Sequence, residues 1–117
     1  MEKHDPDDPV AMYMRELSTI EPLTRNEETS LFQELRGTIG TDQRETIQRR
    51  LIESQLPLVA SIAQKYTASG IPVLNLIQEG NLGLMNSVRS FAEKPTGDFT
   101  TFAATCIEDA ITKAFGK

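Results

Sequence analysis

The chain has 117 residues, a net charge of −5 and 38% hydrophobic residues, a composition typical of one soluble globular domain. No apolar run approaches the roughly 20 residues that a membrane helix needs, and the acidic start MEKHDPDDPV lacks the apolar stretch of a secretory signal. A single cysteine, Cys106, and a single histidine, His4, exclude an internal disulfide, the usual zinc spacings and the common nucleophile–base pairs. We therefore expect a cytoplasmic protein that is not an enzyme, with no metal, no other cofactor, no small-molecule substrate and no membrane contact.

The negative charge lies in the first third of the chain. Residues 1–40 hold nine acids and four bases, whereas residues 41–117 hold eight of each. No segment therefore has the basic excess of a protein that coats duplex DNA, although contact with a few bases inside a larger assembly stays open. We expect residues 1–7 to form an acidic, solvated tail.

Helix start and stop signals predict an all-α fold, a compact bundle of about five helices. Asp8 before Pro9 begins the first helix, which ends ahead of Pro22. The capping box TRNE over residues 24–27 begins the second helix, which ends within residues 37–40. Period-2 alternation, the mark of strands, is absent.

A third helical stretch begins at Thr41 and contains Pro57, which lacks the amide hydrogen that a helix interior uses. We expect a kink or a change of helix near Gln55. A fourth helix is predicted from about residue 73 to 91 and a fifth from about residue 100 to 114, with loops marked by glycine and proline before each.

The fourth helix has two distinct faces. Its inward face is apolar because Ile77, Leu84 and Val88 recur at helical spacing. The opposite face mixes two large apolar side chains with polar ones: Asn75, Gln78, Glu79, Leu82, Met85, Asn86 and Arg89. This face is either scattered surface apolarity or a partner-binding face in which Leu82 and Met85 enter a groove. Gly80 and Gly83 indicate either close helix packing or a bend.

The outward face of the fifth helix is mixed. It carries Thr101, Thr105, Glu108, Asp109 and Thr112, flanked by Phe102 and Cys106. Threonines and an edge phenylalanine are able to hydrogen-bond to and stack on single-stranded bases, whereas two acids repel phosphates. The pattern alone favours a solvated face.

Residues 50–88, RLIESQLPLVASIAQKYTASGIPVLNLIQEGNLGLMNSV, closely resemble domain two of bacterial RNA polymerase sigma factors of the primary, housekeeping type. DPVAMYMRE, residues 8–16, and PLTRNEE, residues 22–28, resemble the segment that precedes this domain. The resemblance implies one helical domain over residues 8–117, with residues 8–40 as the preceding segment and residues 41–117 as the core-binding and minus-ten-type region.

Sigma factors of this type bind the clamp helices in the largest subunit of core RNA polymerase. The resemblance implies that core RNA polymerase is the partner and that the contacts lie at Asn75, Gln78, Glu79, Asn81 and Met85. Leu82 joins them from the face described above. Asn75 stands where the family usually has an aspartate, which removes a possible charge pair with the clamp.

The family also captures the single-stranded minus-ten element by flipping bases and stacking aromatics on them. The resemblance, which is poorer here, places this DNA contact at Tyr13, Met14, Arg15, Gln55, Phe99, Thr101, Phe102, Thr105, Thr112 and Lys113. Several family residues differ: Thr105 and Cys106 replace two tryptophans, Glu108 and Asp109 an arginine and a glutamine, and Gln55 and Pro57 an asparagine and an arginine. Because stacking contributes about 1–3 kcal/mol per base, these changes predict weak or altered capture of single-stranded promoter DNA.

Three functions follow from these patterns. The first is a sigma-like transcription initiation protein that binds core polymerase with altered minus-ten recognition. The alternative is a protein-only regulator or decoy that competes with a true sigma factor without binding DNA. The third is a sigma fragment that is stable but inactive alone, since the later sigma domains, including the helix-turn-helix for the upstream promoter element, are expected to be absent.

Overall fold

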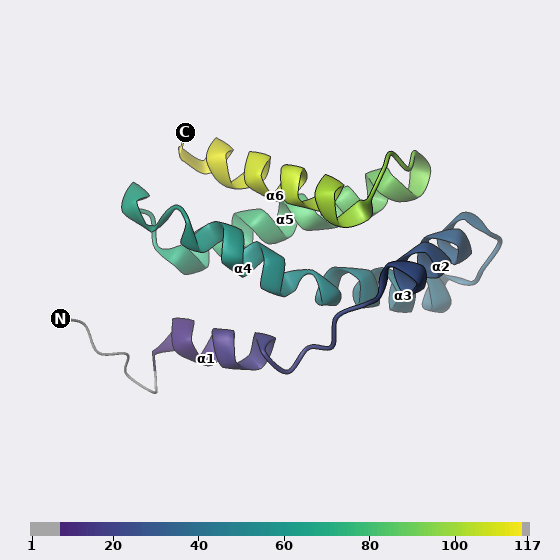
Figure 1. Cartoon of the computed structure of the whole chain (residues 1–117), viewed down its shortest axis with the longest axis horizontal. Coiled ribbons are helices and arrows are strands. Elements are labelled where there is room, and N and C mark those ends of the chain that lie inside the picture. Colours follow the sequence, from purple (N-terminus) through teal and green to yellow (C-terminus); the bar gives the residue numbers. More distant parts are fainter. Residues whose placement is uncertain (1–7, 116–117) are drawn as a thin grey trace.

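The computed structural model describes residues 8–115, and the predicted tail over residues 1–7 lies outside that range. The described part is all helical, with no strand, which confirms the predicted fold class (Figure 1). Its elements in chain order are α1 (Pro9–Leu17), α2 (Arg25–Arg36), α3 (Thr41–Ser54), α4 (Leu56–Gln64), the short 3-10 helix η1 (Thr67–Ser69), α5 (Val73–Glu93) and α6 (Phe99–Phe115). No helix within residues 8–115 combines the length and the apolar character needed to cross a membrane.

The first two helices begin where local signals predict. The Asp8 carboxylate accepts a hydrogen bond of 3.4 Å from the Val10 amide, and Pro9 occupies the first turn. At α2 the capping box is complete: the Thr24 amide donates to Glu27 Oε1 at 2.8 Å, and the Glu27 amide donates to Thr24 Oγ1 at 3.1 Å. Both predicted starts are confirmed.

The third predicted helical stretch is two helices, α3 and α4, which meet at Gln55. The backbone of Gln55 leaves the helical region, with φ −107° and ψ 2°, and Pro57 lies in the first turn of α4. Proline is tolerated there because the first amides of a helix have no partner within it. The predicted change of helix near Gln55 is confirmed.

The longest helices, α5 and α6, lie side by side and run in opposite directions, joined by the short loop over residues 94–98 (Figure 1). Gly83 sets how closely they approach. A Cβ atom at this position would lie 2.6 Å from the Cys106 carbonyl oxygen and 2.8 Å from the Ala110 Cβ. At Gly80 a Cβ atom would lie 2.7 Å from Val59 Cγ1. Since α5 is continuous through both glycines, they serve close packing and not a break.

The core runs along the inner sides of all six α-helices in the described part. Leu51, Leu76, Leu84, Ile107 and Ile111 are fully buried within it. Figure 1 shows α1 packed on α4, on the far side from α6, while α2 and α3 lie toward the α5–α6 loop. The described molecule is therefore elongated, with principal extents of 53 × 31 × 23 Å, and α5 presents a long outward face.

Candidate functional site

The outward strip of α5 is the surface that the sequence singled out. We define it as the residues Asn75, Gln78, Glu79, Leu82, Met85 and Asn86. Leu82 is 56% exposed and Met85 is 44% exposed, the largest exposed apolar side chains on this helix. Gln78 is also exposed, and Glu79 is half-buried at the edge toward α6. The strip is continuous because positions three and four apart share one side of a helix.

Asn81 lies apart from this strip, although the family resemblance includes it among the polymerase contacts. Its side chain is half-buried, and its Oδ1 atom is buried without accepting a hydrogen bond from any of residues 8–115. A buried carbonyl oxygen without a donor is unfavourable by about 1–3 kcal/mol. Asn81 is thus a predicted polymerase contact that lies off the outward strip, with its side-chain oxygen buried.

The structure adds residues of α3 to the surroundings of Met85. A hollow of about 320 Å³ lies beside this side chain, and Gln48 and Ile52 line it from α3, opposite Val88 of α5. Sequence reasoning missed Gln48 and Ile52 because they come from a different helix. No periodicity within α5 signals them.

A cluster of phenylalanines holds the α5–α6 loop against α2. Phe32 of α2 packs on Phe91 and Phe99, with ring centroids 4.9 and 4.8 Å away, and Phe102 lies 5.7 Å from Phe91. Phe99 is only 3% exposed. Its ring is therefore occupied by protein neighbours in this conformation, whereas Phe102 is half-buried and keeps part of its surface open.

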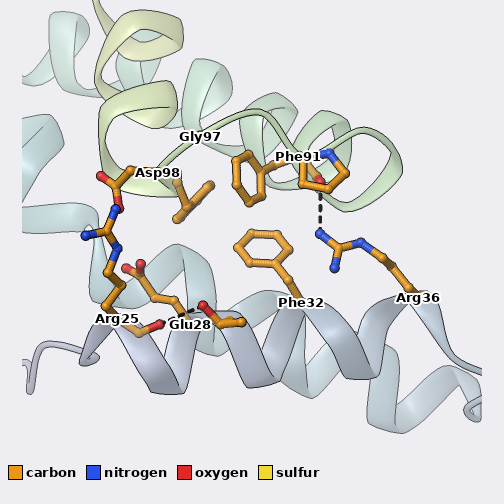
Figure 2. Close-up of a pocket in the computed structure, with 10 residues that line it drawn as sticks. Arg25, Glu28, Phe32, Arg36, Phe91, Gly97 and Asp98 are labelled. Atoms are coloured by element: carbon orange, nitrogen blue, oxygen red, sulfur yellow. Dashed lines mark hydrogen bonds and ion pairs between the residues drawn. The ribbon is translucent and has the colours of Figure 1, made fainter.

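Two arginines of α2 hold the ends of the same loop, and Figure 2 shows them on either side of Phe32. The Arg25 guanidinium forms an ion pair of 3.2 Å with Asp98. At the other end, Arg36 Nε donates to the Ala92 carbonyl at 3.0 Å. Between them lies a cavity of about 190 Å³ with the phenylalanines as its floor. The segment before α6 is thus attached to α2 by an ion pair at Asp98 and by a hydrogen bond from an arginine side chain to the Ala92 carbonyl.

Gln55 lies at the centre of a buried polar group. Its Nε2 donates to Glu28 Oε2 at 2.9 Å and to Thr100 Oγ1 at 3.1 Å, so it joins α2 to α6. Burial raises the pKa of Glu28, and the nearby Asp98 charge adds to this, while the hydrogen bonds from Gln55 and Thr100 act the other way. Gln55 is 7% exposed, so its predicted DNA contact falls on an amide that is buried and engaged here.

The predicted DNA-contacting residues of α6 form a polar ridge. Thr101, Thr105, Thr112 and Lys113 are all exposed. The three threonine hydroxyls donate within α6 or to the residue before it: to Asp98 Oδ2, the Thr101 carbonyl and the Asp109 carbonyl, respectively. On the same side, the Tyr66 hydroxyl donates to Glu108, and this bond raises the pKa of Tyr66. The ridge is therefore hydrogen-bonded internally. Its aromatic neighbours are Phe102 near one end and, toward the other, the Tyr66 and Phe115 rings, whose centroids lie 5.1 Å apart.

The remaining predicted DNA contacts lie on α1. Tyr13 and Met14 are half-buried against the core, and Arg15 is exposed. Because α1 packs on α4 and lies on the far side of α4 from α6 (Figure 1), the structure does not bring these three residues next to the α6 ridge.

Comparison with known proteins identifies the family. The family model described as Sigma-70 region 2 matches residues 51–117. Among the curated relatives are proteins named "RNA polymerase sigma factor SigA" from Lactococcus lactis subsp. cremoris, which is 40% identical over 108 residues, and from Listeria monocytogenes serovar 1/2a, which is 41% identical over 108 residues. The alignments cover 92% of this chain but 29% and 27% of those relatives, so the chain spans less than a third of their length.

The family match therefore contains all of α4, α5 and α6, and with them the outward strip of α5, the α5–α6 loop and the α6 ridge. The relatives extend the similarity to most of the preceding segment that contains α1, α2 and α3. The chain belongs to the sigma-70 region 2 family.

Proposed function

We propose that this chain binds core RNA polymerase through the outward strip of α5 and acts in transcription initiation with weak or altered recognition of the minus-ten element. The strip is proposed to contact the pair of clamp helices in the largest subunit of the polymerase. The observation that carries the proposal is the exposure of Leu82 and Met85 among amides, on the stretch that resembles the core-binding helix of sigma factors.

Energetics support a partner on this strip. Completing the burial of Leu82 and Met85 would contribute about 1 kcal/mol each. Gln78 and Asn86 beside them offer donors and acceptors for a polar rim around that apolar centre. Such a combination is typical of binding centres in which a few apolar side chains supply most of the affinity.

The test is a binding measurement between this chain and purified core polymerase. We expect the wild-type chain to co-purify with core polymerase and the double variant Gln78→Ala with Glu79→Ala to lose that binding. The matched control is Gln33→Ala with Glu34→Ala, the same pair of residues exposed on α2. Unaltered binding by the Gln78 and Glu79 variant would count against the proposed face. A housekeeping sigma factor added as competitor should displace the chain.

A second candidate function is a protein-only regulator or decoy that occupies the same polymerase site and captures no DNA. The acidic side chains of Glu108 and Asp109 on α6 favour it, because they repel the phosphates of a strand. Fluorescence anisotropy with a single-stranded minus-ten oligonucleotide separates the two candidates. This candidate predicts little affinity, whereas sub-micromolar, sequence-dependent binding would overturn the protein-only function.

A further inference from the structure

A groove of about 360 Å³ runs between α5 and α6, along the α6 edge of the outward strip. The side chains that form its floor are small, because Gly83, Cys106 and Ala110 meet there. Gly83 brings the two backbones so close that even a Cβ atom would lie 2.6 Å from the Cys106 carbonyl oxygen. The space at Gly83 itself is thus filled by α6, and the room for a large apolar side chain from outside is the groove volume above this floor of small residues.

Both walls of the groove carry a carboxylate, and the α5 wall also carries a large apolar side chain. Leu82, which is 56% exposed, forms an apolar wall on α5. Carboxylates stand on both sides, Glu79 on α5 and Asp109 on α6, and Lys113 lies one helical turn beyond Asp109. Within residues 8–115, no ion pair neutralises either carboxylate.

The Cys106 thiol on the floor lies in an environment that disfavours its charged form. Burial raises the pKa of Cys106, and the neighbouring Asp109 charge raises it further. The thiol is therefore neutral at physiological pH and acts as a small apolar surface. The groove as a whole combines an apolar floor with two carboxylates at its rims.

We infer that this groove receives a helical segment of the polymerase partner in which a large apolar side chain lies next to a lysine or arginine. The apolar side chain would occupy the floor at Gly83 and Cys106, and the cation would lie between Glu79 and Asp109. A groove between two packed helices suits a helix, whose own ridges fit such depressions. The inference rests on the proposed function and extends its docking surface from α5 onto α6.

The charge of the groove distinguishes a basic protein helix from nucleic acid as its ligand. A DNA strand would bring phosphates toward two carboxylates, which is unfavourable. A basic protein helix gains from the same carboxylates, and Lys113 opposes it. The two kinds of ligand therefore respond with opposite sign to changes at Asp109 and Lys113.

The test measures the affinity of the whole chain for core polymerase with two charge reversals. Asp109→Lys should weaken binding by about tenfold, because it places a cation where the partner's cation sits. Lys113→Glu should tighten binding by a few-fold, because it removes the opposing charge. Both side chains are exposed, so circular dichroism and thermal melting should show an unchanged fold. Higher salt should reduce both effects.

Matched controls are Glu93→Lys and Lys94→Glu, the same reversals at two exposed positions outside the groove, which should leave the affinity unchanged. If Asp109→Lys binds as well as wild type while the Gln78 and Glu79 double variant fails, the groove inference is overturned and the proposed function stands. If the wild-type chain does not bind core polymerase, both are overturned. If Asp109→Lys instead tightens binding to a minus-ten oligonucleotide and leaves polymerase binding unchanged, the groove is a nucleic-acid surface and the inference is overturned.

Discussion

Helices α5 and α6 pack tightly against each other, yet their outward faces have different chemistry. The face of α5 exposes Leu82 and Met85 beside the amides of Gln78 and Asn86, of which Asn86 accepts a hydrogen bond from Arg89. The face of α6 exposes threonines whose hydroxyls donate to nearby acceptors, and beside them the half-buried Glu108 accepts from Tyr66. The inward faces depend on close packing and the outward faces on solvent or partners. The two packed helices therefore present outward faces of different chemistry, as the proposed function requires.

The α6 face shows why the predicted weakening of DNA contact would leave the fold unchanged. Thr105 is exposed, and Cys106 is half-buried in the groove beside α5. Neither position needs a large ring to fill the core, so small residues in place of tryptophans leave the packing of Ala103, Ile107 and Ile111 intact. The fold and the predicted DNA contact are thus separable in this domain.

The largest expected effect lies in the shared interface. Gly83→Ala should destabilise the domain by about 3 kcal/mol, because the new methyl group meets the Cys106 carbonyl and Ala110 and forces the helices apart. Chemical unfolding followed by circular dichroism measures the change. Gly40→Ala is the control, since nothing lies within 4 Å of a Cβ atom there. Equal stability of the two variants would mean that the α5–α6 interface is not close-packed at Gly83.

A second variant tests whether α6 alone accounts for the weak strand capture that we propose. The substitutions Thr105→Trp, Cys106→Trp, Glu108→Arg and Asp109→Gln together should raise the affinity for a single-stranded minus-ten oligonucleotide by about tenfold or more, since each stacked base contributes about 1–3 kcal/mol. Fluorescence anisotropy provides the measurement. No change would place the loss elsewhere, for instance at Pro57 in the first turn of α4.

The smallest expected effect concerns the buried link from α2 to α6. The pKa of Glu28 is raised from its ordinary value near 4.5, so the native state holds this proton more tightly than the unfolded chain does. Its contribution to stability is complete below the ordinary pKa and is lost as pH rises through the raised value. Glu28→Gln should therefore match wild type in acid and gain stability relative to it toward neutral pH. Urea unfolding at several pH values measures this difference.

The neighbouring residue supplies the opposite case. The pKa of Glu27 is lowered, chiefly by the hydrogen bond from the Thr24 amide. Its contribution to stability is present above the ordinary pKa and is lost as pH falls, so Glu27→Gln should lose stability relative to wild type at neutral pH. Two variants with the same sign of pH response would show that the Glu28 carboxylate is not desolvated by burial.

Local signals predicted the elements of this fold. Asp8 with Pro9, the capping box at Thr24, and Pro57 act within one or two helical turns, and each marks the boundary that the structure has. The exposed strip of α5 followed from its 3.6-residue period in the same way. These features could be predicted because their causes lie close together in the sequence.

Partners distant in the sequence could not be predicted. Gln55 bonds to Glu28, 27 residues away, and to Thr100, 45 residues away. The Tyr66 bond to Glu108 spans 42 residues. No local pattern selects among the many polar side chains that tertiary packing can bring to such positions. For the same reason, Phe99 and Gln55 matched family positions for DNA contact although they are buried here.

The break between α3 and α4 has a mechanical consequence. Gln55 closes one helix, precedes the next, and holds α2 and α6 through a single side-chain amide. A rotation of α3 against α4 would displace that amide from both of its acceptors at once. A change in the angle between α3 and α4 is thus coupled to the first turns of α2 and α6, which contain Glu28 and Thr100.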